Sequence, residues 1–431
     1  MRRLRVLHVV HDYFPAIGGS ETLFQKIGEG LAARGAEVWV FTSTALRVSD
    51  FVEGDGTGLP PGLGELNGVH VRRFRYVRFP RWVRRGLGGA AAVWWSRHWP
   101  GYGRVKAAWV GPHLPGLVRA AVRLHPDLIT ATAAPFLPMY AAARAGRRAG
   151  VPVALMPCLH PGDRWLTDNP ALFALLRRAD AVLTLTRFER LLLQSLGVEG
   201  ERLHHLGGGV SPEAPVCASR DLREQFHLPR SEPLVLFFGR KEEGKGLHEI
   251  VEAMRQIWQD GSRATLVLAG ASTTFSATHL LSSLEGLPSE WRSRIIVRDD
   301  VSEAEKWGWY TECDLLVHPS RIESFGLVYL EAWLCGKPVI GGRTGPQASL
   351  IADGRDGLLA EPGHVGELVV ALRRLLSEPG LARALGEAGR AKVLQDFTWA
   401  RVIDRAETLY HTLVGGDHGA LSRERDRRHA R

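Results

Sequence analysis

The sequence predicts an α/β protein built from two Rossmann-like domains. Three observations lead to this prediction. The chain has 431 residues, which exceeds what one hydrophobic core usually supports, so two domains of about 200 residues each are expected. The first segment alternates strand-like and helical patterns. The same alternation restarts after a stretch rich in glycine and proline near the middle of the chain.

The expected N-terminal domain spans residues 1–210. Its opening reads strand, Gly-rich loop, helix and strand, in the segments RVLHVV, HDYFPAIGGSE, an amphipathic stretch to Arg34, and EVWVFTS. Further strand-like runs alternate with helical stretches such as 188–196, and these runs are DLITATA, VPVALMP and ADAVLTLT. A parallel sheet with crossover helices accounts for this alternation.

A second α/β domain is expected over residues 217–395, after a linker at 205–216. Its strand-like runs are PLVLFFG, ATLVLAG, RIIVRDD, CDLLVHPS and KPVIGG. A last helix over 396–415 follows the completed pattern, and we expect it to cross back onto the first domain. Residues 416–431 are polar and basic without an apolar period, which predicts a disordered tail.

Composition excludes several classes of protein. Hydrophobic residues make up 45% of the chain and charged residues 23%, which are ordinary globular values. No apolar run reaches the ~18 residues of a membrane span, and the N-terminus enters a strand-like run without a signal-peptide core, so we expect a cytoplasmic protein. The cysteines form no CxxC pair, which argues against a disulfide framework or zinc site; they are Cys158, Cys217, Cys313 and Cys335.

The net charge of +9 is unevenly spread. No Asp or Glu occurs from Val69 to Pro126, and within residues 69–110, the basic aromatic stretch, arginines interleave with Phe74, Tyr76, Phe79, Trp82, Trp94, Trp95, Trp99 and Trp109. This pattern is typical of a surface that meets lipid headgroups, and it favours peripheral membrane contact and a lipid-linked or phosphorylated acceptor. The alternative is that the tryptophans belong to a core. No nucleic-acid-binding motif accompanies the stretch.

The segment GRKEEGKG supplies candidate cations for a diphosphate. It follows the first strand of the second domain and places Arg240 and Lys245 at the carboxyl end of that strand, where open α/β sheets bind ligands. Negative charge that develops on a diphosphate leaving group would strengthen both contacts in the transition state. The alternative is a solvated turn that carries surface charges.

The segment ESFGLVYLEAWLCGKP predicts a helix from Phe325 to about Cys335, with Ser324 as N-cap. The amides of its first turn would form an anion site, and they belong to Phe325, Gly326 and Leu327. Glu323 and Glu331 are eight residues apart and so can address different parts of one extended ligand, namely sugar and ribose hydroxyls. The alternative is a capped amphipathic helix with a solvated Glu331.

Together these motifs resemble the donor site of retaining glycosyltransferase family 4, which has the GT-B fold, with two Rossmann-like domains facing each other across a cleft. The resemblance covers nearly the whole chain and also includes an N-terminal Gly-Gly loop and a histidine after a mid-domain strand. It implies that Arg240 and Lys245 bind the diphosphate of a nucleotide sugar. It further implies that Glu323 holds the donor sugar and that Glu331 holds the ribose. The Gly-Gly loop, formed by Gly18 and Gly19 with Glu21 nearby, would close the donor site.

His160, in VALMPCLHPGD, resembles the family histidine that contacts the donor sugar and orients or polarises it. Without the resemblance, one of 17 histidines in a loop would be read as a satisfied polar residue. The resemblance implies a front-face reaction that retains the anomeric configuration, with a donor phosphate oxygen accepting the proton. No metal or other cofactor is expected, in line with the lack of an Asp-x-Asp triplet.

Two segments depart from the family pattern. The family often shows Gly-Gly-x-x-Glu where this chain has TGPQAS, so that Pro346 stands for a glycine and Ser349 for the acid. The linker reads GGVS in place of Asn-Gly-Val-Asp. These departures leave the donor base, the sugar and the acceptor open. Two alternative functions also stay open, a nucleotide-sugar epimerase of similar fold and a non-catalytic scaffold at a membrane.

Overall fold

The computed structural model describes residues 3–16, 18–52, 58–77, 111–160, 169–217 and 221–416. Most of the basic aromatic stretch, from 78 to 110, and the predicted tail from 417 onward lie outside the described residues. The chain divides into two compact units. Unit 1 comprises residues 1–207 and 399–431, and unit 2 comprises 208–398.

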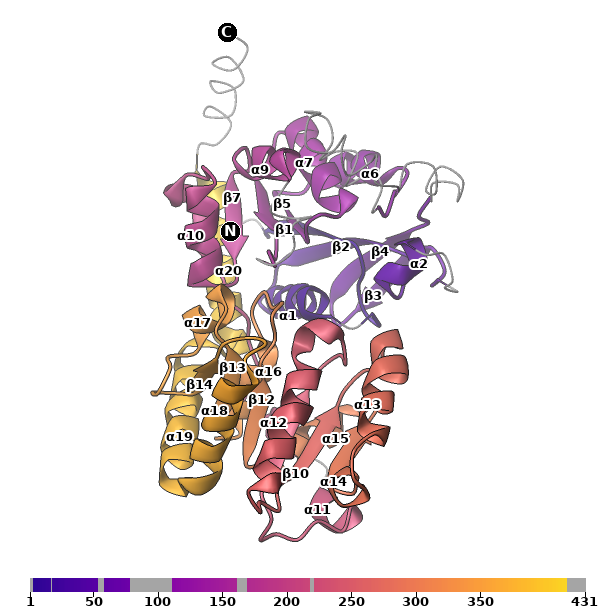
Figure 1. Ribbon diagram of the computed structural model, residues 1–431. Helices are drawn as coiled ribbons and strands as arrows, with labels where there is room; N and C mark the ends of the chain where they lie inside the picture. The colour runs from indigo at the N-terminus through magenta and orange to yellow at the C-terminus, as the bar shows by residue number, and fades with distance from the viewer. Residues whose placement is uncertain are drawn as a thin grey trace. The chain divides into compact units, whose positions relative to one another are not determined.

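Unit 1 is an α/β layer structure around one sheet (Figure 1). Its elements in chain order are β1 (Arg5–Val10), α1 (Gly19–Ala33), β2 (Glu37–Ser43), α2 (Val48–Val52), β3 (Gly62–Leu66), β4 (Val69–Phe74), α6 (Leu117–Leu124), β5 (Leu128–Thr132), α7 (Leu137–Ala149), β6 (Val153–Met156), α9 (Pro170–Leu176), β7 (Ala181–Thr184), α10 (Arg187–Ser195), η1 (Gly200–Arg202), β8 (Leu203–His205) and α20 (Trp399–Gly415).

The sheet of unit 1 has the order β3-β4-β2-β1-β5-β6-β7-β8 in the described residues. Helices cover both of its faces. Successive strand residues point to opposite sides, so each central strand contributes side chains to both helical layers. Leu7 and Val9 pack into a core cluster with Met139 of α7. The intervening His8 contacts Phe24 of α1 and Tyr410 of α20. Burial lowers the pKa of His8 to about 3, so this histidine is a neutral core residue.

Two neighbouring strands of unit 1, β3 and β4, were not among the predicted strand-like runs, and β3 also departs from the expected parallel sheet. β3 pairs antiparallel with β4 at the edge of the sheet. β4 itself, VHVRRF, lies within the basic aromatic stretch and pairs parallel with β2. Its Val69 and Val71 are buried, while Arg72 lies over the ring of Phe74 at 4.9 Å. The start of the stretch is therefore part of the sheet.

The last helix, α20, packs within unit 1. It contacts α1 and β5, and Arg34 at the end of α1 forms ion pairs of 2.7 Å with Asp404 and 2.6 Å with Glu407. A Cβ on Gly30 of α1 would overlap the side chain of Ile403, so a glycine lets the two helices approach closely.

Unit 2 is a second α/β layer structure. Its elements are η2 (Ala214–Cys217), α11 (Leu222–Gln225), β9 (Leu234–Phe238), η3 (Glu243–Lys245), α12 (Leu247–Gln259), β10 (Thr265–Ala269), η4 (Ser276–Leu280), α13 (Leu281–Glu285), α14 (Ser289–Arg292), β11 (Ile295–Arg298), α15 (Glu303–Glu312), β12 (Leu315–His318), α16 (Leu327–Leu334), β13 (Val339–Gly342), α17 (Gly345–Leu350), β14 (Leu358–Ala360), α18 (Val365–Ser377) and α19 (Pro379–Asp396).

The described sheet of unit 2 is parallel throughout, in the order β11-β10-β9-β12-β13-β14. Its core joins Val235 and Phe237 of β9 to Ile250 and Met254 of α12 and to residues of α18. Across the described parts of both units, no helix has the length and apolar character needed to span a bilayer.

Candidate functional site

The sheet of unit 2 reverses its strand order between β9 and β12. The chain passes from β9 through β10 to β11 on one side, and β12 then pairs with the other side of β9. The loops after β9 and β12 therefore flank the kind of crevice in which open α/β sheets bind ligands. GRKEEGKG lies in the first of these loops, and ESFGLVYLEA begins in the second.

Glycines allow these two loops to touch. Gly246 has a φ of +77°, and a Cβ there would lie 2.9 Å from the carbonyl oxygen of Pro319. The Arg321 amide donates to the Gly244 carbonyl at 2.9 Å, and the Ser320 hydroxyl donates to the same carbonyl at 3.3 Å. The two loops thus form one hydrogen-bonded assembly.

Lys245 and Glu323 meet in this assembly. Lys245 Nζ donates to Oε2 of Glu323 at 3.0 Å and to the Ile322 carbonyl at 3.2 Å. Each side chain is only 15% exposed. Because a partly buried ion pair is weakly screened by water, the two charges act strongly on each other and on any ligand that enters beside them.

His318, the last residue of β12, lies close to this pair and was missed by the sequence prediction. Its ring stacks on Phe237 at 5.1 Å, and Nδ1 lies 3.2 Å from the Phe238 carbonyl, which assigns the proton to Nδ1. Burial, and then the charge of Lys245, lower the pKa of His318 to about 4. The ring is therefore neutral at pH 7, although Nε2 lies 3.8 Å from Oε2 of Glu323.

The helix after Glu323 starts later than the sequence predicts. α16 begins at Leu327, and Gly326, with a φ of +95°, occupies the N-cap position in place of Ser324. A Cβ on Gly326 would lie 2.5 Å from the Tyr329 ring, so the turn requires glycine. The Ser324 amide instead donates to Oε1 of Glu323, at 3.2 Å. The first-turn amides, which the sequence predicts as an anion site, accordingly start at Leu327.

Phe325 points into the interior of unit 2. It is buried, its ring lies 6.0 Å from that of Phe397, and its carbon atoms would meet a Cβ on Gly208. The side chain therefore anchors the loop, and only the backbone of this residue is available to a ligand.

Glu331 is held by two groups of α15. Lys306 Nζ donates to Oε1 at 3.1 Å, and the Tyr310 hydroxyl donates to Oε2 at 2.7 Å. Burial acts to lower the pKa of Lys306, but the charges of Glu331 and Glu303 leave it above the ordinary value. With 14% exposure, Glu331 is not the solvated helix residue of the alternative interpretation. Each of its oxygens keeps a lone pair for a further donor.

Arg240 is not grouped with Lys245. Its side chain is 68% exposed and pairs with Glu242 at 3.2 Å. The neighbouring Lys241, which the sequence did not single out, is fully buried and bonds to the carbonyls of Gly270 and Arg298 and to Asp299 at 2.7 Å. Lys241 therefore ties together the loops after β9, β10 and β11.

Unit 1 has its own reversal of strand order, between β1 and β5. His11, which follows β1, stacks on Phe136, which follows β5, with ring centroids 4.0 Å apart. Nε2 of His11 lies 3.0 Å from Oε1 of Glu21 on α1. Burial disfavours both charges, but their hydrogen bond and mutual attraction raise the pKa of His11 and lower the pKa of Glu21. This ion pair holds the start of α1 against the end of β1.

The predicted Gly-Gly loop lies beside this pair. A Cβ on Gly18 would overlap the Glu21 carboxylate, so Glu21 requires a glycine there. A Cβ on Gly19 would meet no atom within 4 Å. Asp12, also unpredicted, is buried nearby, and burial raises its pKa to about 6 in spite of the attraction of His11.

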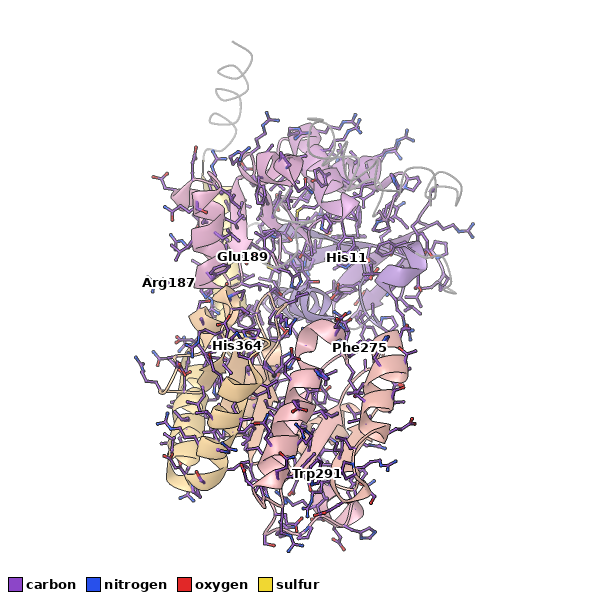
Figure 2. The ribbon with its side chains drawn as sticks, in the orientation of Figure 1. His11, Arg187, Glu189, Phe275, Trp291 and His364 are labelled. Atoms are coloured by element: carbon purple, nitrogen blue, oxygen red, sulfur yellow. The ribbon has the colours of Figure 1, made fainter. Side chains whose placement is uncertain are left out.

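His160 follows β6 in unit 1, two strands from β1 in the sheet. The residue before it, Leu159, donates its amide to Oε1 of Glu189 at 2.8 Å. Glu189 lies on α10 and points into the unit, whereas Arg187 of the same helix points to solvent (Figure 2). Glu189 and His318, which sequence patterns missed, are both buried within or next to apolar runs, where they resemble core residues.

Two family models match this chain, and together they account for most of it. The glycosyl transferase 4-like domain model matches residues 18–209, and the glycosyl transferases group 1 model matches residues 218–392. The chain belongs to the group 1 glycosyltransferases. It is thus a member of a family of enzymes that transfer glycosyl groups.

Curated relatives of this chain have several activities. D-inositol 3-phosphate glycosyltransferase of Xylanimonas cellulosilytica is 32% identical over 51% of this chain, and the match spans only 54% of that relative. Alpha-D-kanosaminyltransferase of Streptomyces kanamyceticus is 26% identical over 91% of this chain and 99% of the relative. The chain therefore spans about half the length of the first relative and nearly all of the second.

Solved structures confirm the GT-B fold for this chain. Sucrose-phosphate synthase from Thermosynechococcus elongatus has a TM-score of 0.69 at 22% identity and covers 95% of this chain and 99% of its own. Anabaena HepE in complex with UDP and glucose has a TM-score of 0.69 at 19% identity and covers 94% and 99%, respectively.

Proposed function

We propose that the protein is a retaining glycosyltransferase that moves a sugar from a nucleotide-sugar donor to an acceptor hydroxyl. The observation that carries this proposal is the meeting of Lys245 and Glu323 between the loops after β9 and β12. A cation, a carboxylate and a helix N-terminus lie together at the strand-order reversal of unit 2. These are the groups that a sugar diphosphate requires.

Lys245 and the first-turn amides of α16 bind the diphosphate. The positive end of the helix adds to the charge of Lys245, and both stabilise the negative charge that grows as the sugar–phosphate bond breaks. When the donor binds, the hydrogen bond from Lys245 to Glu323 weakens and Lys245 donates to a phosphate oxygen. Arg240, exposed and paired with Glu242, has the freedom to turn toward the same diphosphate.

The two glutamates hold the rest of the donor. Glu323 accepts bonds from hydroxyls of the sugar near the reacting carbon, and Glu331 accepts them from the ribose hydroxyls. Lys306 and Tyr310 keep the Glu331 carboxylate in one orientation, which lowers the entropy cost of binding a diol.

The reaction takes place on one face of the sugar. The acceptor oxygen bonds to the anomeric carbon while the bond from that carbon to the diphosphate oxygen breaks, through an oxocarbenium-like state. The proton of the acceptor hydroxyl passes to a phosphate oxygen of the donor. His160 orients the donor sugar, and Gly19 brings backbone close to the donor. Lys245 supplies the charge that a metal ion would otherwise supply, so the reaction is metal-independent.

The donor and acceptor are proposed from chemistry and similarity. HepE, which shares the fold, has been solved with UDP and with UDP-glucose, so UDP is the first nucleotide to test. The basic aromatic stretch supports a phosphorylated or lipid-linked acceptor and peripheral contact of a cytoplasmic enzyme with anionic lipid. Flotation with anionic and neutral vesicles tests this contact, since only anionic vesicles should carry the protein upward.

Incubation of the purified chain with UDP-, GDP- and ADP-sugars, with and without an acceptor panel, tests the function. A retaining transferase releases nucleoside diphosphate, forms an α-linked product from an α-linked donor, and keeps its rate in EDTA. Interconversion of the free donor without acceptor would indicate an epimerase, and donor binding without any turnover would indicate a scaffold.

A further inference from the structure

The chain makes a sharp turn where β6 ends and His160 follows. Met156 is the last residue of the strand, and Cys158 has a φ of +54°, in the left-handed region that a residue with a side chain rarely adopts. Cys158 and Leu159 are both buried. Such a turn persists only when surrounding contacts hold it in place.

Glu189 provides one of those contacts from another part of unit 1, besides the Thr132 hydroxyl, which lies 3.4 Å from Cys158 Sγ. Its Oε1 accepts the Leu159 amide at 2.8 Å, and its Oε2 accepts the Leu185 amide at 2.7 Å. One carboxylate therefore joins the loop after β6 to the loop after β7. Glu189 is only 2% exposed, so water does not compete for either bond.

Helix capping alone does not account for this arrangement. In a capping box, the glutamate at the third helical position bonds to the amide of the N-cap residue. Here the N-cap residue is Thr186, whose hydroxyl accepts the Glu189 amide at 3.1 Å. In place of the Thr186 amide, the Glu189 carboxylate accepts the amides of Leu159 and Leu185, which belong to two separate loops. Its burial carries a desolvation cost, which two backbone donors offset.

We propose that Glu189 is a positioning residue for glycosyl transfer, which sets the place of His160 by holding the Leu159 amide. The strained turn and the carboxylate act together, because the bond to Leu159 fixes the residue that directly precedes His160. The inference rests on the proposed function in one respect, namely that His160 orients the donor sugar. It adds a residue on α10 that has no direct contact with substrate.

Glu189→Gln is the main test. The amide can accept one backbone N–H, but its NH₂ group then faces the other donor. We expect kcat for nucleoside diphosphate release to fall by about tenfold or more, because small misplacements of an orienting group have effects of this size. The Kd for UDP should stay within about twofold, because the diphosphate site lies on unit 2. The shorter Glu189→Asp cannot span both loops and serves as a second variant if Glu189→Gln folds poorly.

Asp180→Asn is the matched control. Asp180 Oδ2 accepts the Val153 amide at 2.8 Å, so it makes the same kind of bond at the opposite end of β6. Both variants should lose thermal stability, but only those at Glu189 should lower kcat and shift the ring signals of His160 in NMR spectra, assigned with His160→Ala. Unchanged His160 signals in both Glu189 variants would overturn the inference. If His160→Ala keeps the kcat of the unaltered protein, the proposed role of His160 fails, and the NMR shift alone then decides the role of Glu189.

Discussion

Lys245 Nζ donates to Oε2 of Glu323 at 3.0 Å, across a sequence separation of 78 residues. The contact joins the loops on either side of the strand-order reversal in unit 2. A cation that already has a carboxylate partner is oriented before the donor arrives, which reduces the ordering cost of binding. The proposed roles of Lys245 and Glu323 can be tested separately by substitution.

Lys245→Ala and Glu323→Ala should each lower turnover by at least about a hundredfold, because each removes a group that acts on the leaving diphosphate or the sugar. Steady-state assays of nucleoside diphosphate release measure this loss. Arg263→Ala is the control, since Arg263 pairs with Glu232 at 2.8 Å before β10 and β9, at the amino ends of these strands. Turnover equal to that of Arg263→Ala would remove Lys245 and Glu323 from the site.

Glu331→Gln should raise KM for the donor by about tenfold, with a smaller change in kcat, since ribose contacts bind the ground state and the transition state alike. Glu303→Gln is the matched control. Glu303 is the other partner of Lys306, at 2.7 Å, but it is 70% exposed. A KM that rises equally in both variants would mean that the effect comes from Lys306 and not from a ribose contact.

Two glycines of α1 should separate folding from function. Gly30→Ala would overlap Ile403 and should destabilise unit 1 by about 1–3 kcal/mol, the usual cost of overpacking. Gly19→Ala has open space around its Cβ, so the melting temperature should not fall, whereas kcat/KM should, because the added methyl group separates the backbone from the donor. Full activity of Gly19→Ala would exclude a close approach of donor to this residue.

The pH dependence of stability should carry the signature of Glu189. Burial raises the pKa of this carboxyl from 4.5 to about 7, so between these values the folded state keeps a proton that the unfolded chain releases. Its contribution to stability therefore falls as pH rises from about 4.5 to about 7 and is constant above that range. Over this range the urea midpoint of the unaltered protein should drop relative to that of Glu189→Gln. Parallel curves would contradict the buried, raised-pKa state.

The predicted parallel strands of both units are present in the structure because their apolar runs, such as LVLFF in β9, are buried on both faces. β3 was missed since GLGEL is almost wholly exposed at the sheet edge. β4 was missed because its arginines mask the alternation of Val69 and Val71. An apolar pattern therefore predicts the buried central strands, but it does not predict these two strands, whose residues are exposed or interrupted by arginines.

The positions of the candidate site residues were predicted in part. Motif spacing placed Lys245, Glu323 and Glu331 on the correct loops and helix of unit 2. The predicted start of α16 was wrong. Ser324 has the chemistry of an N-cap residue, but the left-handed φ of Gly326 places the N-cap at Gly326. The partners of these residues, among them His318 and Tyr310, depend on contacts between distant segments, which local patterns do not encode.

A crystal structure of the protein with bound UDP tests the central claim most directly. We expect the diphosphate between the loops after β9 and β12, within about 3 Å of Lys245 Nζ and of the amide of Leu327. A nucleotide bound elsewhere, with Lys245 still paired only with Glu323, would contradict the proposed donor site.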